Sequence, residues 1–286
     1  MRIVKQYSIT LVFVICLLCV FFCSSALADE SDNDINYTDV PVYVDGLLTC
    51  RGYEIGDCTY VSMDTICDAL GYDAQFGYEP DDQYAQKKTL TIKVCDIEIT
   101  VNSSDRYMCA NGRCLYLPAG YMEIAGEPVF PLEAVAKIFT LDVSRDEENG
   151  TCNVDTSNKA ILQSGDEFYN EEDLYWMSRI ITWESGNQPL EGQIGVGNVV
   201  LNRIDSRKFP NSNTVKEVIF QSGQFDPVAA GVIYKDPFDI SVVAAKLVLE
   251  GYNTVGNAIF FQVARYGEMN EFATYVTTIG GHNFFA

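Results

Sequence analysis

The sequence predicts an α+β protein in which a duplicated, β-rich α+β domain is followed by a mainly α-helical domain. Between residues 40 and 117, short runs of β-branched and apolar residues alternate with Gly, Asp and Asn turn signals, which is typical of strands. Two stretches of the β-rich part, residues 60–74 and 129–143, resemble each other. From Asp173 onward the apolar residues recur at helical spacing instead. These observations define the expected fold class.

Strands are expected in four runs of the β-rich part, at residues 40–44, 89–94, 97–101 and 113–117. The two similar stretches each have the pattern of a strand end, a short amphipathic helix and a second strand. An acidic turn and a β run follow both of them. An internal duplication of an α+β unit explains the similarity most economically.

Three helices are expected in the C-terminal part. The first begins at the N-cap residue Asp173 and stops at Gly186. Its apolar residues share one arc: Leu174, Met177, Ile180 and Ile181. The second begins at Pro189, and Gly197 on its apolar face permits close packing against the first helix. The third, residues 239–250, is so apolar that it should be central, and such a cluster with a few short strands is what a lysozyme-like domain needs.

Residues 1–28 have the pattern of a secretory signal peptide. Arg2 and Lys5 precede an apolar run, residues 9–22, and Ala28 ends a small-residue pattern after which we expect cleavage. The run is shorter than the ~20 residues that span a bilayer, so an uncleaved membrane anchor is the less favoured reading. We therefore expect a secreted protein with no stable membrane insertion after the signal is removed.

Composition divides the rest of the chain. Residues 29–38 are polar and acidic, and a second polar stretch, residues 158–172, is expected to be a linker. The β-rich domain then covers residues 38–157 and the helical domain residues 173–286. The formal net charge of −21 repels the phosphates of nucleic acid, which is therefore not an expected partner.

The cysteines lie away from the helical domain. Three of the ten fall in the signal peptide, and the other seven are Cys50, Cys58, Cys67, Cys95, Cys109, Cys114 and Cys152. Because seven is odd, at least one thiol stays unpaired or the exterior is reducing, and we expect structural thiols or disulfides. The seven include no C-x-x-C pair and the chain has one histidine, so neither a metal site nor another cofactor is expected.

Three common hydrolytic chemistries are poorly supported. Zinc sites normally need more than one imidazole, and His282 stands alone. A cysteine nucleophile is missing from the helical domain. Serine chemistry lacks a Gly-x-Ser-x-Gly motif, and His282 lies close to the C-terminus. Catalysis by carboxyl groups remains.

Glu184 is the leading carboxyl group because it falls on the apolar arc of the first predicted helix. Burial disfavours its charged form, as does the negative end of the helix dipole, and both effects raise a pKa. A raised pKa suits the proton donor of a glycosidase at neutral pH. The spacing equally allows Glu184 to lie at a frayed helix end in water, so this pattern leaves both readings open.

Five motifs of the helical domain occur in the order in which a known family carries them: Trp183-Glu-Ser-Gly-Asn-Gln-Pro, Glu191-Gly-Gln-Ile-Gly-Val-Gly-Asn-Val-Val-Leu-Asn-Arg203, Phe209-Pro, Gln224-Phe225 and Gly281-His-Asn-Phe284. They resemble the SleB-type spore-cortex and cell-wall hydrolase family. The resemblance implies a lysozyme- and lytic-transglycosylase-like fold with Glu184 as the catalytic acid. The usual motif reads Glu-Ala-Arg-Gly-Glu, whereas this chain has Glu184-Ser-Gly-Asn-Gln188, which leaves the fine substrate contacts unassigned.

The resemblance also implies a set of substrate-binding residues: Gln193, Gln224, Phe225, Phe261, Gln262 and His282. Each has an alternative role in packing. Gln193 could orient the Glu184 carboxyl group or be a satisfied amide in the core. Phe261 could stack on a sugar or pack inside the domain, and His282 is more often a structural hydrogen-bonding group at such a position.

The β-rich domain resembles the copper amine oxidase N-terminal-like modules of secreted bacterial wall proteins, in tandem over residues 38–157. The resemblance rests on the repeated order of strand, helix and strand. Copper is not expected, because residues 29–160 contain no histidine and copper sites usually need imidazole. We interpret the module as a spacer or wall-targeting element, with carbohydrate binding as an alternative.

The resemblance to the hydrolase family implies a secreted enzyme that acts on peptidoglycan glycan strands in the cell wall or spore cortex, during sporulation or germination. Our hypothesis is a lytic transglycosylase in which Glu184 protonates the bond between N-acetylmuramic acid and N-acetylglucosamine. A hydrolysing enzyme would usually employ a second carboxylate, for which Asp226 and Glu191 are available. The alternative is a non-catalytic wall-binding protein with a degenerate hydrolase fold, suggested by the altered motif after Glu184.

Overall fold

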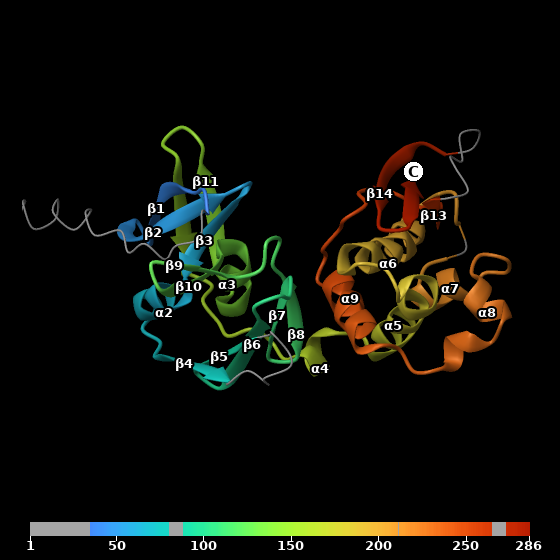
Figure 1. The fold of residues 1–286 in the computed structure, drawn as a ribbon, viewed down its shortest axis with the longest axis horizontal. Coiled ribbons are helices and arrows are strands. Elements are labelled where there is room, and N and C mark those ends of the chain that lie inside the picture. Colours follow the sequence, from blue (N-terminus) through green and yellow to red (C-terminus); the bar gives the residue numbers. More distant parts are fainter. Residues whose placement is uncertain (1–34, 80–87, 211, 265–272) are drawn as a thin grey trace, which may run out of the picture.

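The chain folds into two halves that lie side by side, and Figure 1 shows the β-rich half in blue to green and the helical half in yellow to red. This computed structural model describes residues 35–79, 88–210, 212–264 and 273–286. The predicted signal peptide lies outside these residues. Within them, no helix is both long and apolar enough to cross a membrane. The mixed α+β class predicted from the sequence is confirmed.

The larger sheet of the β-rich half has seven strands in the order β11-β12-β1-β2-β3-β10-β9. These strands are β1 (Thr38–Val44), β2 (Leu47–Ile55), β3 (Cys58–Ser62), β9 (Met122–Ile124), β10 (Glu127–Pro131), β11 (Asp142–Asp146) and β12 (Thr151–Asp155). β1 pairs in parallel with β12, and the other neighbours in the sheet are antiparallel. Val40, Val42 and Val44 are buried at every second position of β1, so one face of the strand packs into the core.

The second sheet is an antiparallel meander of five strands in chain order. It contains β4 (Ala74–Glu79), β5 (Thr89–Val94), β6 (Ile97–Asn102), β7 (Tyr107–Ala110) and β8 (Arg113–Tyr116). Leu90, Ile92 and Val94 of β5 are buried in alternation. The four runs predicted as strands fall in β1, β5, β6 and β8, so these predictions are confirmed.

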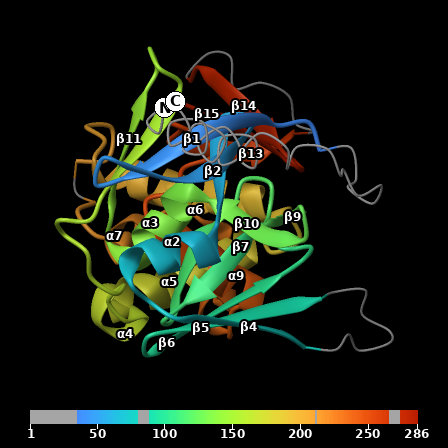
Figure 2. The ribbon, with the colours of Figure 1, turned by 90° about the vertical axis from the view of Figure 1, so that its left-hand side faces the viewer.

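Helices α2 (Met63–Leu70) and α3 (Leu132–Phe139) lie between the two sheets in Figures 1 and 2. α2 follows β3 and α3 follows β10, and these two strands pair with each other. The predicted order of strand, helix and strand is therefore present in both similar stretches. The units differ after the helix, because β4 enters the five-stranded sheet and β11 the seven-stranded sheet. A common origin by duplication stays a prediction.

The helical half is built around α5 (Glu171–Ser185), α6 (Leu190–Ile204) and α9 (Asp239–Leu249). Shorter elements surround them: α4 (Gly165–Phe168), α7 (Val215–Phe220), α8 (Asp226–Ala229), η1 (Val232–Tyr234), β13 (Phe260–Val263), β14 (Tyr275–Ile279) and β15 (His282–Phe285). The last three strands form an antiparallel sheet in the order β13-β15-β14. The three predicted helices are therefore present, and the third is central as expected.

The start of α5 differs from the prediction. The N-cap is Asn170 and not Asp173, because the Asn170 side chain accepts a hydrogen bond of 3.0 Å from the backbone N–H of Asp173. The predicted role of Gly197 is confirmed. A Cβ atom at Gly197 would lie 2.7 Å from Val248 and 3.0 Å from Ile181, so the missing side chain lets α5, α6 and α9 approach closely.

The segment predicted as a linker, residues 158–172, is bound to the β-rich half. The backbone N–H groups of Ala160 and Leu162 donate to the carbonyls of Phe139 and Ile138, at 3.1 and 2.9 Å. α4 then forms within this segment, and the N–H of Gly165 donates to Asn111 at 2.8 Å. The connection is therefore an ordered part of the fold and not a free tether.

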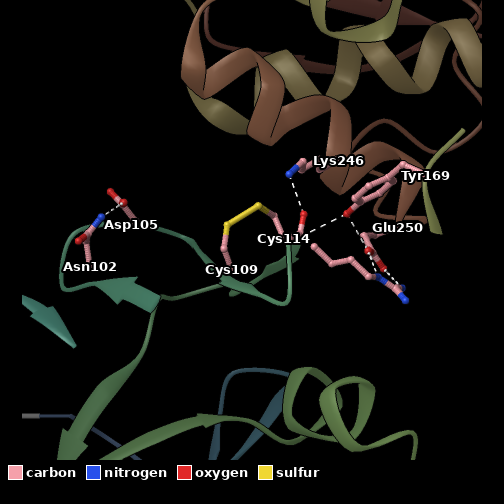
Figure 3. Close-up of a disulfide and its surroundings, with 9 residues drawn as sticks. Asn102, Asp105, Cys109, Cys114, Tyr169, Lys246 and Glu250 are labelled. Carbon is pink, nitrogen blue, oxygen red and sulfur yellow. Dashed lines mark hydrogen bonds and ion pairs between the residues drawn. A yellow bond between two sulfur atoms is a disulfide. The ribbon is translucent and has the colours of Figure 1, made fainter. Parts of the chain in front are cut away.

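The β7–β8 hairpin joins the two halves through a buried ion pair between Arg113 and Glu250. Figure 3 shows Glu250, Tyr169 and Lys246 beside this hairpin. Arg113 of β8 donates two hydrogen bonds of 2.7 Å to the carboxylate of Glu250, which follows α9. Tyr169 donates a third hydrogen bond of 2.8 Å to Glu250, and Lys246 donates to the carbonyl of Gly112 at 2.7 Å. The Glu250 and Arg113 side chains are only 1% and 10% exposed. The halves are therefore docked against each other.

A disulfide between Cys109 and Cys114 crosses this hairpin, with the two Cα atoms 4.2 Å apart (Figure 3). Cys114 is buried in the core of the helical half, although it belongs to β8. The other cysteines in the described part of the chain, Cys50, Cys58, Cys67, Cys95 and Cys152, are free thiols. The disulfide therefore connects the two strands that carry the docking contacts.

We expect Glu250→Gln to lower the free energy of unfolding by about 3 kcal/mol, because it leaves the buried Arg113 guanidinium without its counter-charge. Urea denaturation monitored by circular dichroism measures this change. Arg106→Ala is the matched control, since the Arg106–Glu191 pair has an Arg106 side chain that is 55% exposed, and its loss should change the free energy by less than about 1 kcal/mol. Equal effects of the two substitutions would contradict the assignment of the buried pair as the main docking contact.

Candidate active site

A pocket of about 240 Å³ opens beside the C-terminal end of α5. Its lining comes from α5, α6, the start of α8 with the loop before it, and the small sheet: Glu184, Arg203, Gln224, Asp226, Phe261, Gln262, Val263 and His282. Larger hollows lie between α3 and residues 158–163, at about 830 Å³, and on β4 and β5, at about 330 Å³. Size alone therefore does not single out the α5 pocket, but its chemistry does.

Glu184 carries an unusual pKa. Burial raises the pKa of its carboxyl group to about 7, the neighbouring Asp226 adds to this rise, and the Arg203 guanidinium opposes it. The Glu184 carboxyl group is therefore largely withdrawn from water and lines the pocket. The alternative of a frayed helix end in water does not hold for this carboxyl group. Near neutral pH both its protonated and ionised forms are populated, so the group can donate a proton and later accept one.

Arg203, in the last turn of α6, faces the same pocket and was not among the predicted site residues. Its Nε donates a hydrogen bond of 2.8 Å to the carbonyl of Ile259, and its guanidinium lies 4.7 Å from the ring centre of Phe209 and 5.0 Å from that of Phe225. Burial lowers the pKa of Arg203 to about 10, while Glu184 raises it. Among the described residues none accepts a hydrogen bond from its Nη1 atom. A buried cation beside an acid favours the ionised form of that acid.

The small sheet brings Phe261, Gln262 and His282, three of the predicted substrate-binding residues, to the pocket. β13 and β15 pair so that Phe261 lies opposite Phe284, and the His282 and Phe261 ring centres are 5.4 Å apart. Burial lowers the pKa of His282, so its imidazole is neutral at pH 7. Among the described residues the Nδ1 atom of His282 has no hydrogen-bond partner. A neutral imidazole at this position could hydrogen-bond to a bound ligand but adds no positive charge.

The predictions for Gln224 and Phe225 have different outcomes. Gln224 lines the pocket. Phe225 is buried behind it, next to the Arg203 guanidinium and with its ring centre 6.4 Å from that of Phe261. Phe225 therefore supports the pocket wall from behind. It does not line the pocket, so the expected contact with substrate is absent.

Gln193 does not reach the pocket. Its Oε1 accepts a hydrogen bond of 2.7 Å from Ser241, and its Nε2 donates to the carbonyl of Gln188 at 3.1 Å. These bonds occupy the amide between α6 and α9, where the side chain is buried. The prediction that Gln193 binds substrate or orients Glu184 is therefore wrong, and the packing alternative holds.

The two candidate second carboxylates are separated by the fold. Asp226 lines the pocket and acts electrostatically on Glu184. Glu191 instead accepts hydrogen bonds from Arg106 at 3.0 Å and from Tyr116 at 3.1 Å, both in the β-rich half. Glu191 therefore belongs to the docking contacts, which leaves Asp226 as the candidate beside Glu184.

The altered motif after Glu184 has structural roles in this chain. The Gln188 side chain accepts a hydrogen bond of 2.6 Å from the backbone N–H of Gly281. At Gly186, a Cβ atom would lie 2.9 Å from the Phe238 ring, so the glycine makes room for this aromatic residue. Ser185 donates to the carbonyl of Ile181 at 2.9 Å. These residues shape the end of α5.

Metal ligands are not grouped in the described part of the chain, where no cluster of three or more His, Cys, Asp or Glu side chains could hold an ion. The pocket instead combines four ionisable groups: the Glu184 carboxyl group with a pKa of about 7, the Asp226 carboxyl group, the buried Arg203 guanidinium and the neutral His282 imidazole.

Comparison with known proteins assigns both halves of the chain to families. Residues 187–285 match the family described as Cell Wall Hydrolase, and residues 48–154 match the copper amine oxidase N-terminal domain. The helical half is a cell wall hydrolase domain. The family match begins just after Glu184 and does not include it.

The cell wall hydrolase domain is similar to spore cortex-lytic enzymes. One from Bacillus cereus is 37% identical over 93 residues, which are 32% of this chain and 35% of the relative. One from Bacillus subtilis (strain 168) is 31% identical over 93 residues, 32% of this chain and 30% of the relative. The chain thus spans about a third of the length of the curated relatives it matches.

Two solved structures are also similar to the cell wall hydrolase domain. The catalytic domain of the germination-specific lytic transglycosylase SleB from Bacillus anthracis is 31% identical, with a TM-score of 0.38 over 41% of this chain and 97% of that one. The catalytic domain of the Bacillus cereus SleB protein is 32% identical, with a TM-score of 0.38 over 41% of this chain and 92% of that one.

We expect Glu184→Gln to stabilise the cell wall hydrolase domain at pH 8 and to have little effect near pH 4. The pKa of Glu184 is raised from 4.5 to about 7 on folding, so protonation favours the folded state. That contribution is complete below pH 4.5 and is lost as the pH rises to about 7, whereas glutamine keeps a neutral side chain throughout. Thermal unfolding of both proteins between pH 4 and 8 measures the difference, and a gap that does not widen with pH would contradict the burial of Glu184.

Proposed function

We propose that the cell wall hydrolase domain is a lytic transglycosylase that cleaves peptidoglycan between N-acetylmuramic acid and N-acetylglucosamine, with Glu184 as its catalytic acid. The observation that carries this proposal is a carboxyl group with a pKa of about 7 on the wall of an open pocket. The names of its relatives, spore cortex-lytic enzyme and germination-specific lytic transglycosylase, support the same reaction class.

In the first step the protonated Glu184 donates its proton to the glycosidic oxygen, and the bond from this oxygen to the muramic C1 breaks. The ionised Glu184 then accepts the proton of the muramic O6 hydroxyl, and O6 bonds to C1 to close a 1,6-anhydro ring. No water is consumed, and Glu184 regains its proton. One carboxyl group is therefore sufficient, provided that both of its protonation states are accessible at the working pH.

Arg203 and Asp226 balance these two states. Arg203 favours the carboxylate that accepts the O6 proton, and Asp226 favours the protonated form that starts the reaction. The neutral His282 and the Gln224 and Gln262 amides would supply hydrogen bonds to the sugar groups around the reacting bond. Phe261 offers a ring beside them.

The cellular setting is part of the proposal. A signal peptide at residues 1–28 would export the chain to the cell wall or spore envelope, where cortex and vegetative peptidoglycan are the candidate substrates. The docked β-rich half, which resembles modules of secreted wall proteins, would act as a spacer or wall-targeting element for the catalytic domain.

We expect Glu184→Gln to reduce peptidoglycan cleavage by about 10²- to 10⁴-fold, because glutamine can neither donate nor accept the proton. Zymography on purified peptidoglycan measures the clearing, and mass spectrometry of the products should find 1,6-anhydromuramic ends. Undiminished clearing by the variant would refute the role of Glu184, and reducing ends without anhydro sugar would refute the transglycosylase reaction. If neither the wild type nor the variant clears, the wall-binding alternative is favoured.

We expect the alkaline limb of the pH–rate profile to move in opposite directions for two pocket variants. The first step needs protonated Glu184, so the rate should fall as the pH rises through about 7. Arg203→Gln removes a neighbour that lowers the pKa of Glu184, which moves the fall to higher pH. Asp226→Asn removes a neighbour that raises it, which moves the fall to lower pH. Initial rates of peptidoglycan solubilisation between pH 5 and 9 measure both shifts, and shifts in the same direction would contradict the electrostatic roles.

A further inference from the structure

Aromatic side chains follow the outer side of α5 from its first turns to its C-terminal end. Three of them are among the most exposed large side chains of the helical half, namely Tyr234 at 62%, Phe238 at 51% and Tyr175 at 41%. Exposed aromatic groups gathered on one surface mark a binding site more often than isolated ones do. We name this group the α5 aromatic strip: Tyr175, Trp176, Trp183, Phe220, Tyr234 and Phe238.

The rings at the start of α5 hold each other in place. Trp176 contacts Tyr175 and Phe220 edge to face, with ring centres 4.8 Å apart in both pairs, and Tyr234 lies 6.0 Å from Trp176. Because Trp176 and Phe220 also pack against the core, the exposed rings rest on a rigid base. Little conformational entropy is lost when a ligand stacks on side chains that are already fixed.

The strip continues to the end of α5 that carries Glu184. The Phe238 ring lies 6.1 Å from the Trp183 ring and against Gly186, and its backbone N–H donates to Thr182 at 3.1 Å. The ammonium group of Lys235 is 5.6 Å from the centre of the Trp183 ring. Phe238 is therefore anchored to the helix turn that contains Glu184.

Two chain segments connect the strip to the pocket. α5 carries Trp176 and Glu184 eight positions apart, a rise of roughly 12 Å along the helix. The segment from Asp226 to Phe238 begins in the pocket lining, passes through α8 and η1, which both contact α5, and ends at the strip. The pocket and the strip are thus built on the same two segments of the chain.

The pocket is too small for a polymeric substrate. Its volume of about 240 Å³ is below the roughly 300–1,000 Å³ of pockets that enclose drug-sized ligands. If the proposed function holds, most of a bound glycan strand lies outside the pocket, on the surface next to it. The strip lies next to the pocket and has exposed rings near both ends of α5, so it can contact such a strand.

We propose that the α5 aromatic strip binds the peptidoglycan glycan strand on one side of the bond that Glu184 cleaves. The C–H faces of pyranose rings stack on aromatic faces, and charged side chains at the rim hydrogen-bond to sugar hydroxyl and amide groups. Asp236 is such a rim group, because its side chain is 98% exposed. It pairs at 3.3 Å with Arg179, whose buried guanidinium lies 3.6 Å from the Tyr175 ring. Lys216 and Glu172, paired at 2.6 Å, lie on the Trp176 side.

The test measures binding of the full chain to purified, protein-free peptidoglycan sacculi, in a Glu184→Gln background that prevents cleavage. We expect the added pair Tyr234→Ala and Phe238→Ala to raise the apparent Kd roughly tenfold, because two stacking contacts are lost. Tyr275→Ala in the same background is the matched control, since Tyr275 is exposed to a similar extent, 49%, and lies on β14, outside the strip. Unchanged binding by the Tyr234/Phe238 variant would overturn the proposal. A strip that binds a protein partner and not glycan would give this same result.

Two further measurements make the outcome specific. Circular dichroism and thermal melting check that the strip variant is folded, and Tyr175→Ala, another surface substitution, should weaken binding if the strip acts as a unit. The catalytic proposal fails separately, when the wild type binds sacculi without cleaving them. The strip proposal fails when the wild type cleaves and the strip variants bind like their parent.

Discussion

The burial of Glu184 beside Arg203 is the constraint on which the pocket depends. A carboxyl group and a guanidinium group withdrawn from water each lose hydration, and this loss raises the pKa of the acid and lowers that of the base. Their mutual attraction partly offsets both effects. The balance leaves the acid close to half protonated at neutral pH, which is a condition that a single exposed glutamate does not meet.

That burial follows from the close approach of three helices. Gly197 lets α6 contact Ile181 of α5 and Val248 of α9, and the last turns of α5 and α6 then bring Glu184 and Arg203 to one wall. The small sheet adds to the lining, because the pairing of β13 with β15 places Phe261, Gln262 and His282 together. The pocket is thus a product of packing between elements that are far apart along the chain.

The β-rich half is attached at a different surface of the same helical core. Arg113 and Glu250 are almost completely buried where β8 meets the end of α9, and a second contact joins Arg106 and Tyr116 to Glu191. Loss of either partner of such a pair would leave an unpaired buried charge, which is costly. The disulfide between Cys109 and Cys114 lies in the hairpin that carries these contacts. The β-rich half therefore has a fixed place on the hydrolase domain.

The sequence by itself determined the local structure. The alternating runs form β1, β5, β6 and β8, and the helical spacing put Glu184 on the apolar arc of α5, because these patterns depend only on neighbouring residues. The spacing left the burial of Glu184 open, and the tertiary packing decided it. Only the tertiary structure placed Arg203 against Glu184, kept Asp226 in the pocket, and took Glu191 and Gln193 out of it. It also paired Cys109 with Cys114 among seven candidates. These outcomes depend on contacts between segments distant in sequence, and local spacing carries no information about which of them will meet.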